Sequence, residues 1–143
     1  MAALCILSVI LAIGSCHGGS AKDAKSYVAQ GVDLIKKEQY NQAIDILDKA
    51  IQADPNYALA YNYRGIAHYR SKSFDKAMAD FNKAIQLNPN LAEAYNNRAY
   101  CYFHNRDYQK AEEDASKAQE MKYKVDQEFL KELRLRQATG SKK

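Results

Sequence analysis

The chain has few of the residues that interrupt helices. Its 143 residues include two prolines and six glycines, whereas alanine, lysine, glutamine and glutamate, which favour helices, are common. Cysteine is also scarce: the three cysteines, at positions 5, 16 and 101, provide no internal disulfide framework. The composition therefore favours one small all-helical domain.

Residues suited to catalysis or metal binding are equally scarce. The chain has three histidines, and none stands in a Ser–His–Asp pattern with a recognisable context. Cys101 and His104 are three residues apart and can share a helix face, but two ligands make an incomplete zinc site. His68 falls on a packing position, and Cys101, among aromatics, is expected to be a buried thiol. We therefore expect no enzymatic activity, no metal site and no cofactor.

An excess of one charge sign is missing from most of the chain. Residues 16–121 contain 14 Lys or Arg and 14 Asp or Glu, and the net charge of +4 comes from residues 122–143, with seven positive and three negative side chains. No aromatic platform accompanies these basic residues, so nucleic acid is not an expected partner. A solvated helix end that contacts anionic lipid headgroups or an acidic partner is the better interpretation.

The one long apolar run lies at the N-terminus. The segment MAALCILSVILAIGSC carries no charged side chain, and its apolar run of about a dozen residues is too short for a spanning helix, which needs roughly 20. The run is typical of a secretory signal peptide, predicted at 1–15, followed by a tether at 16–23. No Lys or Arg precedes it, which departs from the usual pattern.

The residues IGSC, at 13–16, resemble the lipobox of bacterial lipoproteins. The resemblance implies cleavage before Cys16, a lipid on its thiol and acylation of the new amine, so that Cys101 remains the one free thiol. His17 follows instead of aspartate, which favours the outer membrane. The alternative is ordinary cleavage and a soluble periplasmic or secreted product.

A motif recurs with a spacing of 34 residues. ALAYNYR at 58–64 aligns with AEAYNNR at 92–98, and AKSYVAQG at 24–31 lies one period earlier. A fixed period of this size indicates a repeat architecture. The aligned positions share residue type, and the series are Tyr27, Tyr61, Tyr95; Gly31, Gly65, Ala99; Tyr40, Phe74, Tyr108; Ala43, Ala77, Ala111; Leu47, Phe81, Ala115; and Ala50, Ala84, Ala118.

Each repeat reads as an antiparallel helix pair. A polar turn (KKEQ, RSKS or HNRD) separates two helical segments, and the second carries a stripe of small or apolar residues at i, i+4 and i+7. Asn41 and Asp75 suit helix starts, because short polar side chains can cap orphan amides. Pro55 and Pro89 end the first two units.

This pattern resembles the tetratricopeptide repeat, over residues 24–57, 58–91 and 92–125. The resemblance implies an all-α, right-handed solenoid of three antiparallel helix pairs. The departures are His68, Ala115 and Tyr123, where that family has a tyrosine, a bulky residue and a proline. A helix at 126–138 is predicted to cap the open end, with Val125, Phe129 and Leu133 facing the third repeat and Lys131, Arg134 and Gln137 facing water, and residues 139–143 form a basic tail.

In proteins with this repeat, the first helices line a concave groove that binds a peptide or protein segment. Carried over by position, the predicted groove consists of Asn62, Tyr63, Ile66, Arg70, Asn96, Asn97, Tyr100 and His104. Asparagines can hydrogen-bond a peptide backbone, and tyrosines give large contact area at low entropic cost. Alternatively, Tyr63 and Tyr100 pack between neighbouring helices.

Some members of the family hold the C-terminal carboxylate of chaperones with cations and asparagines. The matching positions here are Val28, Val32, Tyr63, Glu93 and Asn97. No cation is present and Glu93 is acidic, so a two-carboxylate clamp is not expected. The sequence predicts a non-catalytic protein-interaction module, lipid-anchored in a bacterial envelope. The alternative is an adaptor or assembly subunit of an envelope, secretion or pilus complex with one large fixed partner.

Overall fold

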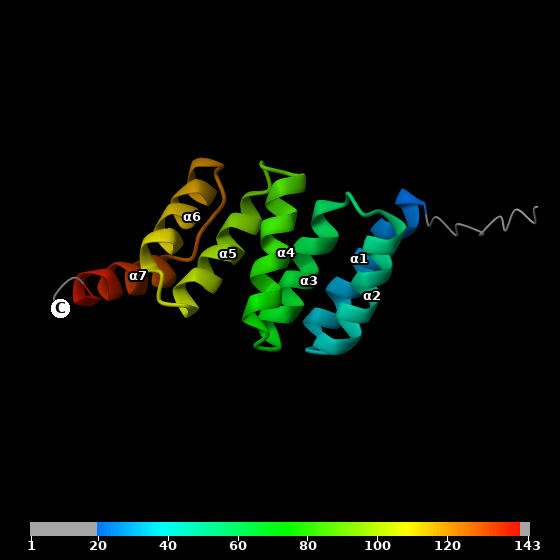
Figure 1. Ribbon diagram of the computed structural model, residues 1–143, viewed down its shortest axis with the longest axis horizontal. Helices are drawn as coiled ribbons and strands as arrows, with labels where there is room; N and C mark the ends of the chain where they lie inside the picture. Colours follow the sequence, from blue (N-terminus) through cyan, green and yellow to red (C-terminus); the bar gives the residue numbers. More distant parts are fainter. Residues whose placement is uncertain (1–19, 141–143) are drawn as a thin grey trace, which may run out of the picture.

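The computed structural model describes residues 20–140, which form seven α-helices. The helices are α1 (Ala21–Lys36), α2 (Tyr40–Ala53), α3 (Ala58–Arg70), α4 (Phe74–Leu87), α5 (Ala92–His104), α6 (Tyr108–Glu120) and α7 (Gln127–Gly140). Figure 1 shows three antiparallel pairs side by side in one row, with α7 at the C-terminal end. The predicted all-helical solenoid is confirmed.

The predicted signal peptide and Cys16 lie outside the described residues, as do residues 141–143 of the basic tail. Within residues 20–140, no helix combines the length and the apolar character that crossing a membrane requires.

Small residues let the two helices of each pair approach closely. A methyl group on Gly31 would lie 2.6 Å from Leu47 Cγ, and one on Gly65 would lie 2.6 Å from Phe81 Cε1. The third pair has Ala99 opposite Ala115, and both are fully buried. A glycine therefore faces a bulky side chain in the first two pairs, whereas in the third pair the methyl group of Ala99 occupies space that the smaller Ala115 leaves.

The turns between paired helices repeat one backbone feature. Glu38, Lys72 and Arg106 have φ angles of 59°, 64° and 63°, in the left-handed region that favours glycine. The helices that follow begin at Tyr40 and Phe74, and the residues before them form no side-chain cap. The caps predicted at Asn41 and Asp75 were therefore wrong, because both residues lie inside the first turn, after the residue at which each helix begins.

Helix α7 covers the C-terminal end of the stack. Val125, Phe129 and Leu133 are 2%, 6% and 1% exposed, and the Phe129 ring stacks on Tyr100 with 4.0 Å between centroids. The predicted capping stripe is confirmed. Gln137 differs from the prediction, because its Nε2 donates to the backbone oxygen of Tyr108 at 3.2 Å and to Glu112 Oε2 at 2.8 Å.

Candidate functional site

A hollow with a volume of about 390 Å³ lies among the second and third helix pairs. Its lining residues come from α3, α4 and α5, and they are Ile66, Tyr69, Arg70, Phe81, Asn97 and Tyr100. Phe81 is 1% exposed and belongs to the core, whereas Arg70 is exposed. The hollow therefore has an apolar base, aromatic walls and a cation at its edge.

The structure brings four of the eight predicted groove residues to this hollow: Ile66, Arg70, Asn97 and Tyr100. Sequence reasoning missed Tyr69 and Phe81. Tyr69 lies three residues after Ile66, one helical turn further on, and this spacing could have revealed it. Phe81 was assigned to the core stripe, and it does serve the core, so only the three-dimensional structure shows its second role.

Two predicted asparagines are placed differently from the expectation. Asn62 is 0% and Asn96 is 7% exposed. Asn62 Oδ1 accepts a hydrogen bond from Asn97 Nδ2 at 3.1 Å, whereas Asn62 Nδ2 and Asn96 Oδ1 have no partner among the described residues. Both side chains lie inside the helix stack because their positions face the neighbouring helix, not the surface.

The two tyrosines expected to anchor a ligand also pack against protein. Tyr100 stacks on Phe129 and meets Tyr69 edge-to-face, with 6.4 Å between centroids. Tyr63 packs against the core of the first repeat. Burial raises the pKa of both hydroxyl groups. Each ring is only partly buried, so packing leaves part of both surfaces open.

His104 lies apart from the main hollow. Its exposed ring stacks on Phe74, with centroids 3.5 Å apart, and it lines a second hollow of about 370 Å³ with residues 72–76 and Asn105. The predicted row of eight residues is thus divided: Asn62 and Asn96 lie in the interior, four residues line the main hollow, His104 lines this second depression, and Tyr63 packs against the first repeat.

A carboxylate lies near Tyr63. Burial raises the pKa of Glu93, and the nearby amide of Asn62 partly opposes this effect. Glu93 also raises the pKa values of Tyr63 and Tyr123, although less than burial does for either hydroxyl. Glu93 therefore places an acidic group near Tyr63, but it lines neither of the two hollows.

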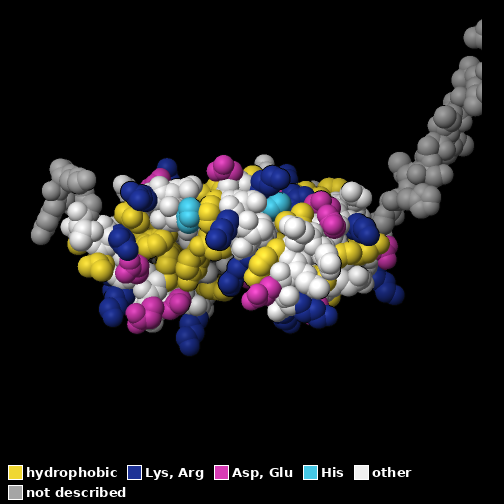
Figure 2. Space-filling view, turned by 90° about the horizontal axis from the view of Figure 1, so that it is seen from below, with side chains coloured by type: hydrophobic (Ala, Val, Ile, Leu, Met, Phe, Trp, Pro, Cys, Tyr) yellow, Lys and Arg dark blue, Asp and Glu magenta, His cyan; other side chains and the backbone are white. Residues whose placement is uncertain are grey.

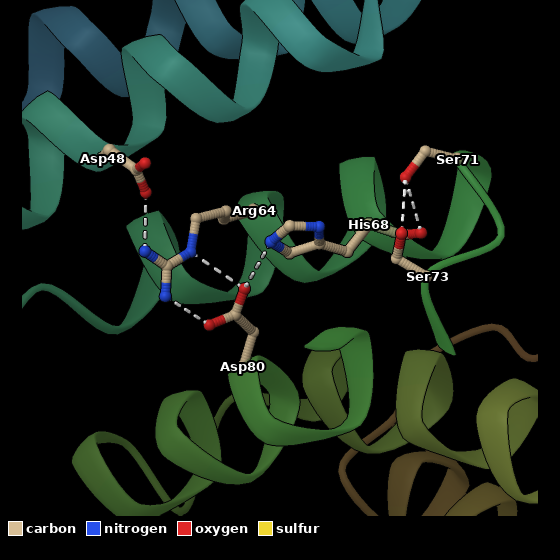
Figure 3. Close-up of polar contacts among 6 residues, drawn as sticks. All are labelled: Asp48, Arg64, His68, Ser71, Ser73 and Asp80. Atoms are coloured by element: carbon tan, nitrogen blue, oxygen red, sulfur yellow. Dashed lines mark hydrogen bonds and ion pairs between the residues drawn. The ribbon is translucent and has the colours of Figure 1, made fainter. Parts of the chain in front are cut away.

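An ion-pair network links the first two helix pairs (Figure 3). Arg64 Nη1 donates to Asp48 Oδ1 at 2.6 Å, and Nε and Nη2 donate to the two Asp80 oxygens at 2.9 and 2.6 Å. The hydrogen bond to Asp80 is the main reason why the pKa of Arg64 is raised. Asp80 is 5% exposed, so the bidentate contact compensates a buried carboxylate.

His68, Ser71 and Ser73 lie near this network (Figure 3), but they form no catalytic triad with Asp80. His68 Nε2 lies 3.9 Å from Asp80 Oδ2, but Nδ1 has no partner among the described residues. The Ser71 hydroxyl donates to the backbone oxygen of His68 at 2.9 Å, not to the imidazole. In a triad, the imidazole must accept the proton of the serine hydroxyl. Burial lowers the pKa of His68, which favours the neutral ring.

The third repeat contains the equivalent network. Arg98 donates from Nε and Nη2 to the two Asp114 oxygens at 2.6 and 2.7 Å, and from Nη1 to Asn82 Oδ1 at 2.8 Å. Each residue lies 34 positions after its counterpart, which marks the network as a structural element of the repeat. The recurrence of an arginine and an aspartate 16 residues apart in two repeats is the sequence signal that could have revealed it.

The remaining reactive side chains among residues 20–140 do not assemble into a site. Cys101 is fully buried, which raises the pKa of its thiol to about 12, while His104 is exposed. Across residues 20–140, His, Cys, Asp and Glu side chains form no group of three or more that could hold a metal ion.

Comparisons with known proteins agree with this architecture. Two tetratricopeptide repeat models match residues 28–92 and 81–113. The first TPR domain of Spaghetti (RPAP3), solved with the HSP90 peptide SRMEEVD, is 26% identical with a TM-score of 0.78, over 87% of this chain and 98% of that one. The first TPR domain of human RPAP3 is 29% identical with a TM-score of 0.76, over 85% and 96%.

The TPR2B domain of yeast Sti1, solved as its pHsp70 complex, is 28% identical with a TM-score of 0.67, over 70% of this chain and 80% of that one. No curated protein matches the sequence. With two repeat models spanning residues 28–113 and solved TPR domains sharing its fold, the chain is an all-α solenoid of tetratricopeptide repeats.

Proposed function

We propose that the protein is a non-catalytic interaction module that binds a segment of a partner protein in the hollow between the second and third repeats. The observation that carries this proposal is the hollow itself, which combines apolar, aromatic and polar side chains, as ligand pockets do. Structural neighbours solved with HSP90 peptides support a peptide as ligand.

We also propose that the mature protein is anchored in a bacterial envelope through lipid on Cys16. The apolar run and the IGSC sequence that follows it support this proposal. The outer membrane is the favoured location.

Mass spectrometry of the mature protein should find a lipid-modified Cys16 as the first residue, and labelling with a fatty-acid analogue should be lost in Cys16→Ser. An unmodified N-terminus elsewhere would contradict the anchor.

Site-directed photocrosslinking tests the interaction function. A photoreactive amino acid replaces Asn97, which lines the hollow, or Glu113, which is exposed on α6, and each variant is illuminated in membranes of the source organism. Adducts that form from position 97 and not from position 113 would support the groove. A single large adduct would favour a fixed assembly partner, whereas several small ones would favour short segments. Equal adducts from both positions would place the partner elsewhere.

A further inference from the structure

The main hollow offers space and chemistry for one large apolar side chain. Its volume of about 390 Å³ is at the lower end of ligand pockets, roughly 300–1,000 Å³, which suits a part of a chain segment. Ile66 and Phe81 supply aliphatic and aromatic surface, and Tyr69 and Tyr100 meet edge-to-face beside them. A leucine, methionine or phenylalanine would replace water with apolar contact here.

The guanidinium group of Arg70, at the edge of the hollow, is available to a ligand. Arg64 and Arg98 are both engaged with carboxylates, whereas Arg70 is exposed and takes part in no ion pair with a described residue. Lys36 and His104 occupy the equivalent positions at the ends of α1 and α5. Figure 2 shows this end of the helix pairs, where Lys and Arg side chains border an apolar patch. A guanidinium group can receive a carboxylate through two parallel hydrogen bonds.

Asn97 supplies a contact of another kind. Its Nδ2 donates to Asn62 Oδ1, which fixes the orientation of the amide and leaves Oδ1 as an acceptor. That oxygen suits a backbone N–H of an extended segment. The hollow therefore combines apolar surface, the cation Arg70 and the amide oxygen of Asn97 as an acceptor, all within the same set of lining residues.

We propose that the partner segment places a large apolar side chain in this hollow and the carboxylate of an adjacent Asp or Glu on Arg70. This inference rests on the proposed interaction function and names the chemistry of its ligand. The acidic group comes from a side chain inside the segment, not from a chain terminus. A terminal clamp would need further cations, and its matching positions hold Val28, Val32 and Glu93.

Three labelled peptides, blocked at both ends, test the proposal by fluorescence anisotropy. The first has a Leu-Glu-Glu core between Ser-Gly spacers, the second replaces both glutamates with lysine, and the third replaces leucine with serine. The first peptide should bind about tenfold more tightly than either of the others. A fourth peptide, identical to the first but with a free C-terminal carboxylate, should gain no affinity.

Arg70→Glu should reverse the preference, so that the lysine peptide binds more tightly than the glutamate peptide. Arg134→Glu is the matched control, because Arg134 is exposed on α7 and lines none of the hollows described above; it should leave the preference unchanged. Equal affinity for the acidic and basic peptides, no binding of any peptide, or the same loss in both variants would overturn the inference. The interaction function is judged separately by the crosslinks from position 97.

Discussion

Replacing Gly65 with alanine should destabilise the protein, although alanine normally stabilises a helix. An ideal Cβ at position 65 would lie 2.6 Å from Phe81 Cε1, 2.9 Å from Cδ1 and 3.0 Å from Cζ. Real Cβ atoms essentially never approach other atoms as closely as the first two distances. The Phe81 ring is 1% exposed, so it must move within a packed core to admit the methyl group.

The size of the effect is a difference between two opposing contributions. Alanine in place of a helical glycine gains about 1 kcal/mol. Inserting a methyl group into a well-packed core costs about 1–3 kcal/mol, and a rigid buried ring places the cost in the upper part of that range. We therefore expect Gly65→Ala to lower the free energy of unfolding by about 1 kcal/mol, as a net result of both contributions.

Urea unfolding followed by circular dichroism measures this change, and the other repeats supply the controls. Ala99→Gly should cost about 1 kcal/mol through helix propensity, because Ala115 leaves room for the native methyl group. In a Phe81→Ala background, Gly65→Ala should lose its destabilising effect, since the two positions then match Ala99 and Ala115 of the third repeat. A Gly65→Ala variant that is more stable than the parent, with no change of effect in that background, would refute the packing argument.

Three further outcomes follow from the buried polar groups. Arg64→Ala should lower the free energy of unfolding by about 3–5 kcal/mol, because it leaves the buried Asp80 unpaired. Arg134→Ala, at an exposed position, should change it by less than about 0.5 kcal/mol. Similar losses for the two variants in urea unfolding would contradict a stabilising role for the Arg64 network. Burial raises the folded-state pKa of Glu93, so ionisation of this carboxyl opposes folding. Wild type should therefore lose stability relative to Glu93→Gln as pH rises through the folded-state pKa, and the pH-dependent part of the difference should vanish below the unfolded pKa of about 4.3. A stability difference that does not depend on pH would contradict this explanation. With Cys5 and Cys16 changed to serine, Cys101 should react with a thiol reagent only when the chain opens, since its pKa is raised to about 12; reaction at the rate of a free thiol in the absence of denaturant would show that the site is open.

The 34-residue period predicted the parts of the structure that every repeat shares. The aromatic and alanine series gave the helix pairs, because a buried stripe at helical spacing permits few alternatives. The same register placed Phe129 and Leu133 on the buried face of α7, where the structure has them. These features follow from which side of a helix is apolar, and the sequence contains that information directly.

Helix starts and turns were less predictable. The caps expected at Asn41 and Asp75 assume that a side chain must satisfy the first amides, but α2 and α4 begin without a side-chain cap. Their turns instead use left-handed residues such as Lys72. A lysine carries no signal for that conformation, which glycine or asparagine would have suggested, so the turn geometry depends on packing between the paired helices.

The candidate site shows why a repeat predicts a binding surface only in part. Comparing repeats shows which positions are equivalent, but the shape of a hollow depends on the side chains by which the repeats differ at those positions. At the positions equivalent to Tyr69 and Phe81, the first repeat has Ile35 and Leu47, and the main hollow forms beside the aromatic pair. Asn62 and Asn96 occupy equivalent positions and are both buried, so a position can be polar in two repeats and still face the interior. Specificity in this chain is therefore expected where side chains break the repeat at an exposed edge, as Lys36, Arg70 and His104 do, and a ligand that senses Arg70 must lie across the second and third repeats.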